Sequence, residues 1–100
     1  MRMGEDWAHE FTLPFDAALV RKAEIVYAQQ WERVITKTEA DCSLTGNTVQ
    51  LTVTAEETMR LNHKKSLQVQ AQFLLLGGKR VRTDIYIVNV DPVLSKVVLT

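Results

Sequence analysis

The amino-acid sequence predicts a small all-β protein. Between residues 66 and 90, two alternating segments meet at Gly77-Gly78, and the first of them, LQVQAQFLL, places apolar and polar side chains on opposite faces. Paired glycines adopt the positive φ angles of a tight hairpin turn without steric cost. The other alternating segments are short and recur at a spacing typical of β-sandwiches. We therefore expect an immunoglobulin-like antiparallel β-sandwich of about seven short strands with one short helical turn.

Length and composition are those of one folded domain: 100 residues, 46% hydrophobic and 24% charged. Residues 1–8 are mostly polar and lack a period, so we expect a flexible leader there and a single β-sandwich domain over residues 9–100. No apolar run reaches the ~18 residues that span a bilayer, and the start of the chain lacks the apolar segment of a secretory signal. Together with a lone cysteine, these features predict synthesis in a reducing cytoplasm and no membrane partner.

Five further strands precede the terminal hairpin. We expect them at residues 9–15, 21–29, 33–38, 41–44 and 48–54. Pro14 restricts the first strand to the edge of a sheet, because proline cannot donate a ladder hydrogen bond. In the second strand, alternation places Ala23, Ile25 and Tyr27 inward. Turns are expected at residues 30–32 and 45–47, and residues 16–20 have room for one helical turn.

Thr54-Ala55-Glu56-Glu57 matches a capping box, in which the threonine hydroxyl and the second glutamate each satisfy a backbone amide of the other. A helical turn over residues 55–61 should follow, with Met59 and Leu61 packed beneath it. The polar residues 62–65 are then a loop that leads into the terminal hairpin.

The last segment is apolar on both faces. One parity holds Val81, Thr83, Ile85 and Ile87, and the other holds Tyr86, Val88 and Val90. A bulge that shifts the register explains this pattern, and so does a subunit interface that covers a second apolar face. We favour the interface, because Leu74, Leu76 and the Val97-Val98-Leu99 tail are also surplus apolar surface.

Catalytic and metal-binding patterns are missing from the sequence. His9, His63 and Cys42 occur singly, without the clustered spacing of metal ligands. Cysteine is often buried as a small hydrophobe, and we expect this of Cys42. Adjacent Glu56 and Glu57 are explained by the electrostatic preference for acids at a helix start. We therefore expect no enzyme, no catalytic residue, no metal and no cofactor.

Charge is balanced overall, with 12 basic and 12 acidic residues, but it is unevenly distributed. Residues 1–57 have five basic and ten acidic residues, whereas residues 58–100 have seven and two. The balance argues against nucleic-acid binding, which depends on neutralising phosphates, and no aromatic residues interleave with the basic hairpin tip at residues 79–82. The asymmetry has two interpretations: complementary surfaces that join subunits, or chance in a fold that interleaves both halves.

Several motifs carry a resemblance that spans nearly the whole chain. They are HEFTLPF, A-x-I-x-Y at residues 23–27, EADC, GNTVQLTVTAEETMRL, LQVQAQFLL and VDPVL. In these the chain resembles a family of short, mostly uncharacterised β-sandwich proteins encoded among structural genes of bacteriophages and prophages of Gram-positive bacteria. It departs from that pattern at the more basic tip, Gly77-Gly78-Lys79-Arg80. The resemblance implies a virion or assembly component near the head–tail junction, tail or baseplate, and it transfers no catalytic residue.

Our leading expectation is a non-enzymatic phage structural or accessory protein, made in the host cytoplasm and then virion-associated. It would self-associate into a homo-oligomer and contact other phage structural proteins. The candidate interface consists of Trp31, Arg80, Arg82, Tyr86, Val88, Val90, Val97 and Leu99. The alternative is a carbohydrate- or ligand-binding module that uses Trp7, Trp31 and Tyr86, and the third is a small enzyme with Cys42 and a histidine.

Overall fold

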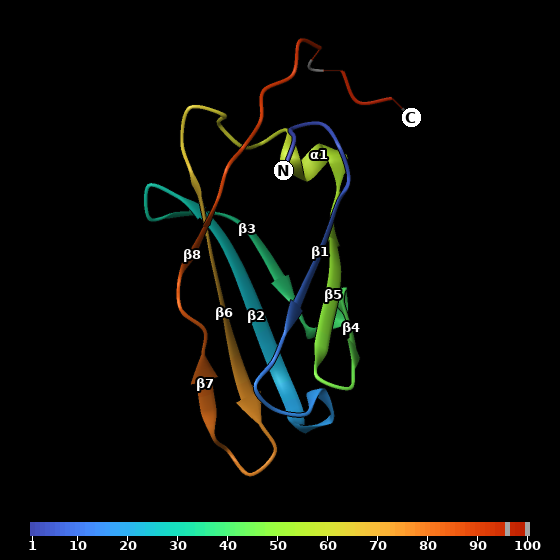
Figure 1. The fold of residues 1–100 in the computed structure, drawn as a ribbon, viewed down its shortest axis with the longest axis vertical. Coiled ribbons are helices and arrows are strands. Elements are labelled where there is room, and N and C mark those ends of the chain that lie inside the picture. Colours follow the sequence, from blue (N-terminus) through green and yellow to red (C-terminus); the bar gives the residue numbers. More distant parts are fainter. Residues whose placement is uncertain (96, 100) are drawn as a thin grey trace.

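The structure is a computed structural model that describes residues 1–95 and 97–99. Within this range two antiparallel sheets pack face to face, as expected for a β-sandwich (Figure 1). The strands are β1 (Trp7–Thr12), β2 (Val20–Gln29), β3 (Glu32–Thr38), β4 (Cys42–Thr45), β5 (Thr48–Val53), β6 (Leu67–Leu75), β7 (Arg80–Arg82) and β8 (Tyr86–Val88). One short helix, α1 (Ala55–Thr58), follows β5, and single 3₁₀ turns lie at Ala17–Leu19 and Glu39–Asp41.

The strand order confirms the immunoglobulin-like prediction. The smaller sheet has the order β1-β5-β4, and the larger has β3-β2-β6, with β7 and β8 in succession along the far side of β6. These are the B-E-D and C′-C-F-G sheets of an immunoglobulin-like sandwich, with β7 and β8 together as strand G. No A strand occurs among the described residues. The predicted edge strand is confirmed as β1, which ends before Pro14.

Inward-facing residues of both sheets form the core, as their alternation predicts. Ile25 and Tyr27 of β2 and Val49 of β5 are fully buried, and the apolar residues of β6 are buried at every second position. The predicted inward set Ala23, Ile25 and Tyr27 is confirmed. Tyr27 lies on the strand where immunoglobulin domains place their core tryptophan.

The predicted turns are present. Gly77 and Gly78 have φ of 91° and 90°, values that glycine adopts without penalty. The capping box is confirmed, since the Thr54 hydroxyl accepts from Glu57 N–H and the Glu57 carboxylate accepts from Thr54 N–H. The helix is shorter than predicted. Its continuation tightens into bonds between residues three apart, Arg60 to Glu57 and Leu61 to Thr58, which bring Leu61 into the core.

A bulge accounts for the apolar residues on both parities of the last strand. Val81 is opposite Phe73, and Tyr86 is opposite Val69. Four residues on the outer strand therefore face three on β6, and one extra residue reverses the parity. Tyr86 and Val88 are inward-facing for this reason, whereas Ile85 and Ile87 face outward and are exposed. The interface that we favour for this strand stays a prediction.

The first eight residues are packed against the domain, which corrects the expected flexible leader. Met3 is buried, its N–H donates to the Asp91 carbonyl at 3.1 Å, and Asp91 N–H donates to the Met1 carbonyl at 2.8 Å. Gly4 N–H donates to the hydroxyl of fully buried Thr58 at 2.9 Å. These bonds reach far along the chain, so no local period in the sequence announces them.

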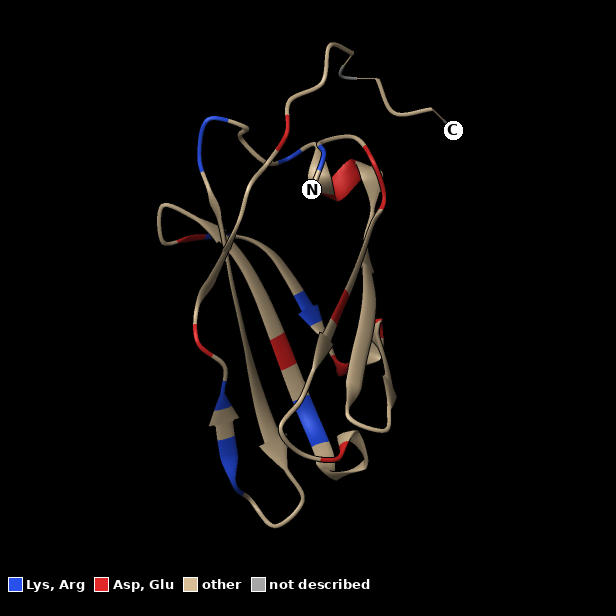
Figure 2. Cartoon of the chain, viewed as in Figure 1, with Lys and Arg blue, Asp and Glu red and all other residues tan. Residues whose placement is uncertain are grey.

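Charges from the two halves of the chain are interleaved by the fold (Figure 2). The basic residues at 64–65 precede β6 and those at 79–82 follow its end, so they lie at opposite ends of the larger sheet (Figure 2). The basic residues of the second half therefore do not form one continuous patch.

Candidate functional site

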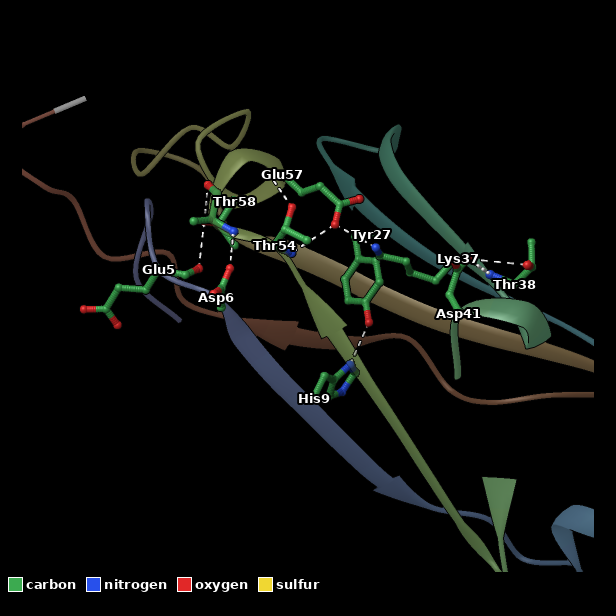
Figure 3. Close-up of polar contacts among 11 residues, drawn as sticks. Glu5, Asp6, His9, Tyr27, Lys37, Thr38, Asp41, Thr54, Glu57 and Thr58 are labelled. Carbon is green, nitrogen blue, oxygen red and sulfur yellow. Dashed lines mark hydrogen bonds and ion pairs between the residues drawn. The ribbon is translucent and has the colours of Figure 1, made fainter. Parts of the chain in front are cut away.

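A buried histidine connects the two sheets. His9 of β1 faces the larger sheet, and its Nδ1 lies 2.8 Å from the hydroxyl of Tyr27 on β2 (Figure 3). Its Nε2 is hydrogen-bonded to the hydroxyl of Tyr86 on β8. The Trp7 ring stacks on the imidazole, with centroids 4.5 Å apart and planes 11° apart. Both ring nitrogens thus have partners inside the sandwich.

The chemistry of this cluster is that of a closed hydrogen-bond chain. A neutral imidazole has one N–H and one lone pair, so one tyrosine accepts from the ring and the other donates to it. Burial lowers the pKa of His9 and thereby favours the neutral form. Burial also raises the pKa of Tyr27 strongly and that of Tyr86 to about 12. At neutral pH the imidazole and both tyrosines are therefore uncharged, and their hydrogen bonds join the two sheets.

We expect the protein to lose stability as the pH falls below 6.5. The pKa of His9 lies below 6.5 in the folded protein and near 6.5 in the unfolded chain, so the unfolded chain binds more protons in this window. The contribution of neutral His9 to the free energy of unfolding is fully present above the pKa of the unfolded chain. Below that pKa, the free energy of unfolding declines by at most about 1.4 kcal/mol per pH unit. Urea unfolding between about pH 7.5 and 5.5 measures the slope. This dependence of the free energy of unfolding on pH should persist in His63→Gln, since His63 is exposed, and disappear in His9→Gln.

A second polar link connects the sheets through α1. The Lys37 ammonium of β3 lies 2.6 Å from the Glu57 carboxylate, and the two side chains are only 11% and 19% exposed (Figure 3). Burial alone would raise the pKa of Glu57, but hydrogen bonds from Lys37 and from Thr54 N–H hold it below its usual value. One carboxylate therefore caps the helix and pairs with an inward-facing lysine.

Cys42 is half-buried rather than buried. Its thiol lies 3.3 Å from the Thr38 carbonyl, and burial, followed by the neighbouring Asp41, raises its pKa, which disfavours the reactive thiolate. Among the described residues, no three His, Cys, Asp or Glu side chains are grouped closely enough to hold a metal ion. The described part of the chain also contains no helix long and apolar enough to cross a membrane.

The candidate interface residues fall into two groups. Trp31, Val97, Leu99, Arg80 and Arg82 are exposed. Tyr86 is partly exposed, and its hydroxyl is hydrogen-bonded to His9, whereas Val88 is half-buried.

Val90 corrects our prediction, because it is buried in the core and is not available to a partner. Sequence reasoning also missed exposed Ile85, Ile87 and Leu94. The first two face outward because of the bulge, which the alternation alone does not locate.

A shallow hollow lies on the outward face of the larger sheet, next to the β2–β3 hairpin. Trp31 borders it, and the outward glutamines of β6 line it. These glutamines, Gln68, Gln70 and Gln72, were predicted to face solvent, and they are half-exposed.

Neither a scan of the chain against models of known protein families nor a search of curated proteins gives a match.

Proposed function

We propose that this protein is a non-enzymatic bacteriophage or prophage structural or accessory component that acts through protein–protein contacts in virion assembly. The motif resemblance supports the phage context. The single observation that carries the mode of action is the exposed apolar segment after β8. Leu94, Val97 and Leu99 are 107%, 74% and 92% exposed. Apolar side chains concentrated on a surface mark interaction sites, because covering them removes apolar area from water.

This segment is anchored at its start. Val90 is buried and Val93 packs against the core, so the exposed residues leave the domain from a fixed point. Ile85 and Ile87, at 43% and 58% exposure, add apolar surface on the outward side of the same terminal region of the chain. A partner that covers the tail, whether a second copy or another virion protein, gains the burial that the isolated chain lacks.

The polar core is consistent with this mode of action. His9, Tyr27 and the Lys37–Glu57 pair have their hydrogen-bonding groups engaged in joining the two sheets. Groups held in this way stabilise a scaffold and are not presented to a substrate. The described chain therefore offers surfaces for contact.

Light scattering over a range of protein concentrations, at low and high salt, tests the proposal. We expect a defined oligomer, or a stable complex with virion proteins, that weakens by roughly tenfold or more for each of Leu94→Ser and Leu99→Ser. Loss of association in high salt would assign it to Arg80, Arg82 and acidic partners, whereas insensitivity to salt would assign it to the apolar tail.

The control is Leu76→Ser, which removes an apolar side chain that is 60% exposed at a different site, the β6–β7 hairpin. It should leave the association unchanged. A wild-type chain that stays monomeric at every concentration and binds no virion protein would contradict the proposed function.

A further inference from the structure

The tip of the β2–β3 hairpin has a tryptophan where the backbone favours glycine. Gln30 and Trp31 form a two-residue turn with φ of 51° and 66°, the positive values that such turns require. A bulky residue is strained in this region, and strain of this kind gathers at functional sites. Trp31 is 76% exposed, so packing within the chain does not offset the strain. These two features make Trp31 a candidate contact residue for a ligand outside the chain.

Trp31 borders the hollow on the outward face of the larger sheet, which we name the Trp31 groove. Ala28 is opposite Gln68 and Val26 is opposite Gln70, so short β2 side chains form a floor beside the longer glutamines of β6. Its volume is about 210 Å³, below the roughly 300–1,000 Å³ of pockets for drug-sized ligands. The groove therefore has the dimensions for one small ring and not for a large ligand.

Three glutamines along the groove are held in fixed orientations by hydrogen bonds of 2.9 Å. The Gln68 side chain accepts from the backbone N–H of Trp31. The Gln70 side chain donates to the Thr83 carbonyl, and the Gln72 side chain donates to the Glu24 carboxylate. In the described part of the chain, the amide nitrogen of Gln68 and the carbonyl oxygens of Gln70 and Gln72 have no further partner. The groove thus presents one oriented donor group and two oriented acceptors beside an exposed indole.

We propose that the Trp31 groove binds one ring of a neutral saccharide. A pyranose has an apolar C–H face that packs on an indole, and its hydroxyl groups both donate and accept. Its hydroxyl groups can accept from the free amide of Gln68 and donate to the free carbonyls of Gln70 and Gln72. Because the glutamines are already oriented, binding costs little additional side-chain entropy.

Charge and apolar surface in the groove favour a neutral sugar over an ionic ligand or a protein. The Glu24 carboxylate lies 3.5 Å from the Arg33 guanidinium, so these two charges offset each other, and the one other charged residue of the lining, Arg82, lies at the Gln72 end of the groove. The exposed apolar side chains, Trp31 and Ile85, lie on opposite sides of β6, separated by its row of glutamines. A protein interface core needs contiguous apolar surface, which this arrangement interrupts.

The experiment titrates the wild-type chain with neutral oligosaccharides of glucose, galactose, mannose, rhamnose and N-acetylglucosamine, followed by saturation-transfer NMR and calorimetry. We expect at least one to bind with a Kd of about 1 mM or tighter. Trp31→Gly should weaken that binding about 30-fold, as expected for an aromatic anchor. The same variant should keep or raise the melting temperature, because glycine relieves the strained turn. This pairing of lost binding with retained stability distinguishes a ligand platform from a structural tryptophan.

Gln70→Leu should also weaken binding. Gln50→Leu is its matched control, because Gln50 lies on β5 of the other sheet and donates to Glu10 at 2.9 Å. Absence of binding to every oligosaccharide, or binding that Trp31→Gly leaves unchanged, would overturn the proposal. An oligomer that Trp31→Gly dissociates, with no saccharide bound, would make Trp31 an interface residue and also overturn it. The tail variants test the proposed function through residues outside the groove, so the two proposals fail independently.

Discussion

Replacing Glu57 by alanine is expected to lower the free energy of unfolding by about 3–5 kcal/mol, the largest effect that we predict for a single side chain. The substitution leaves the Lys37 ammonium, whose side chain is 11% exposed, without its partner at 2.6 Å. It also removes the acceptor for Thr54 N–H at the start of α1. A buried charge without a counter-ion keeps its desolvation cost and loses the compensating attraction, which is why the effect exceeds that of a surface pair.

Urea unfolding of two further variants, one single and one double, separates these contributions. Thr54→Ala removes part of the cap and retains the ion pair, and it should cost about 1 kcal/mol. Lys37→Met combined with Glu57→Gln removes both charges and should recover most of the loss in Glu57→Ala. A cost below about 1 kcal/mol for Glu57→Ala, abolished by salt, would mean that water screens the pair and that it does not join the sheets.

Alternation and turn chemistry were sufficient to predict the sandwich because both are local. The strand at LQVQAQFLL and the turn at Gly77-Gly78 depend on residues that are neighbours in sequence. The capping box at Thr54 likewise spans four residues. Each of these patterns lies within one segment, so it predicts the local structure without knowledge of the tertiary contacts.

The corrections arise where distant segments decide the structure. The bulge before Tyr86 is visible only as a mismatch in register with β6, and an apolar pattern on both parities does not distinguish it from an interface. The first residues are ordered by bonds to Asp91 and Thr58, far along the chain. The sequence alone does not predict which distant residues the last strand and the first residues contact.

The polar core was only partly predictable. His9 shares parity with Phe11 and Leu13, so alternation alone would have placed it inward, and Tyr27 was expected inward. Their pairing depends on the packing of the two sheets, and Tyr86 joins only because the bulge reverses its direction. Trp31 was recognised as a tryptophan in a turn, but its strained backbone and the groove beside it required the structure.

His9→Ala is expected to lower the free energy of unfolding by about 3 kcal/mol. The imidazole is 7% exposed, and its loss opens a cavity between the sheets and removes the stack on Trp7. It also leaves the hydroxyl of Tyr27, a fully buried residue, without its partner at 2.8 Å. Chemical unfolding at pH 7.5 or above measures this cost while wild-type His9 is neutral. A change below about 0.5 kcal/mol, as for an ordinary surface substitution, would contradict a linking role.

The two tyrosines provide the internal comparison, because they offer His9 the same hydroxyl in different surroundings. Tyr27→Phe leaves a buried ring nitrogen unpaired and should cost about 1–3 kcal/mol. Tyr86 is 37% exposed, so water can replace its hydroxyl in Tyr86→Phe, and the cost should stay within about 0.5 kcal/mol. Equal costs would show that the cluster is uniformly wet or uniformly dry. A larger cost for Tyr27→Phe than for Tyr86→Phe would mean that the hydrogen bond to β2 contributes more to stability than the hydrogen bond to β8.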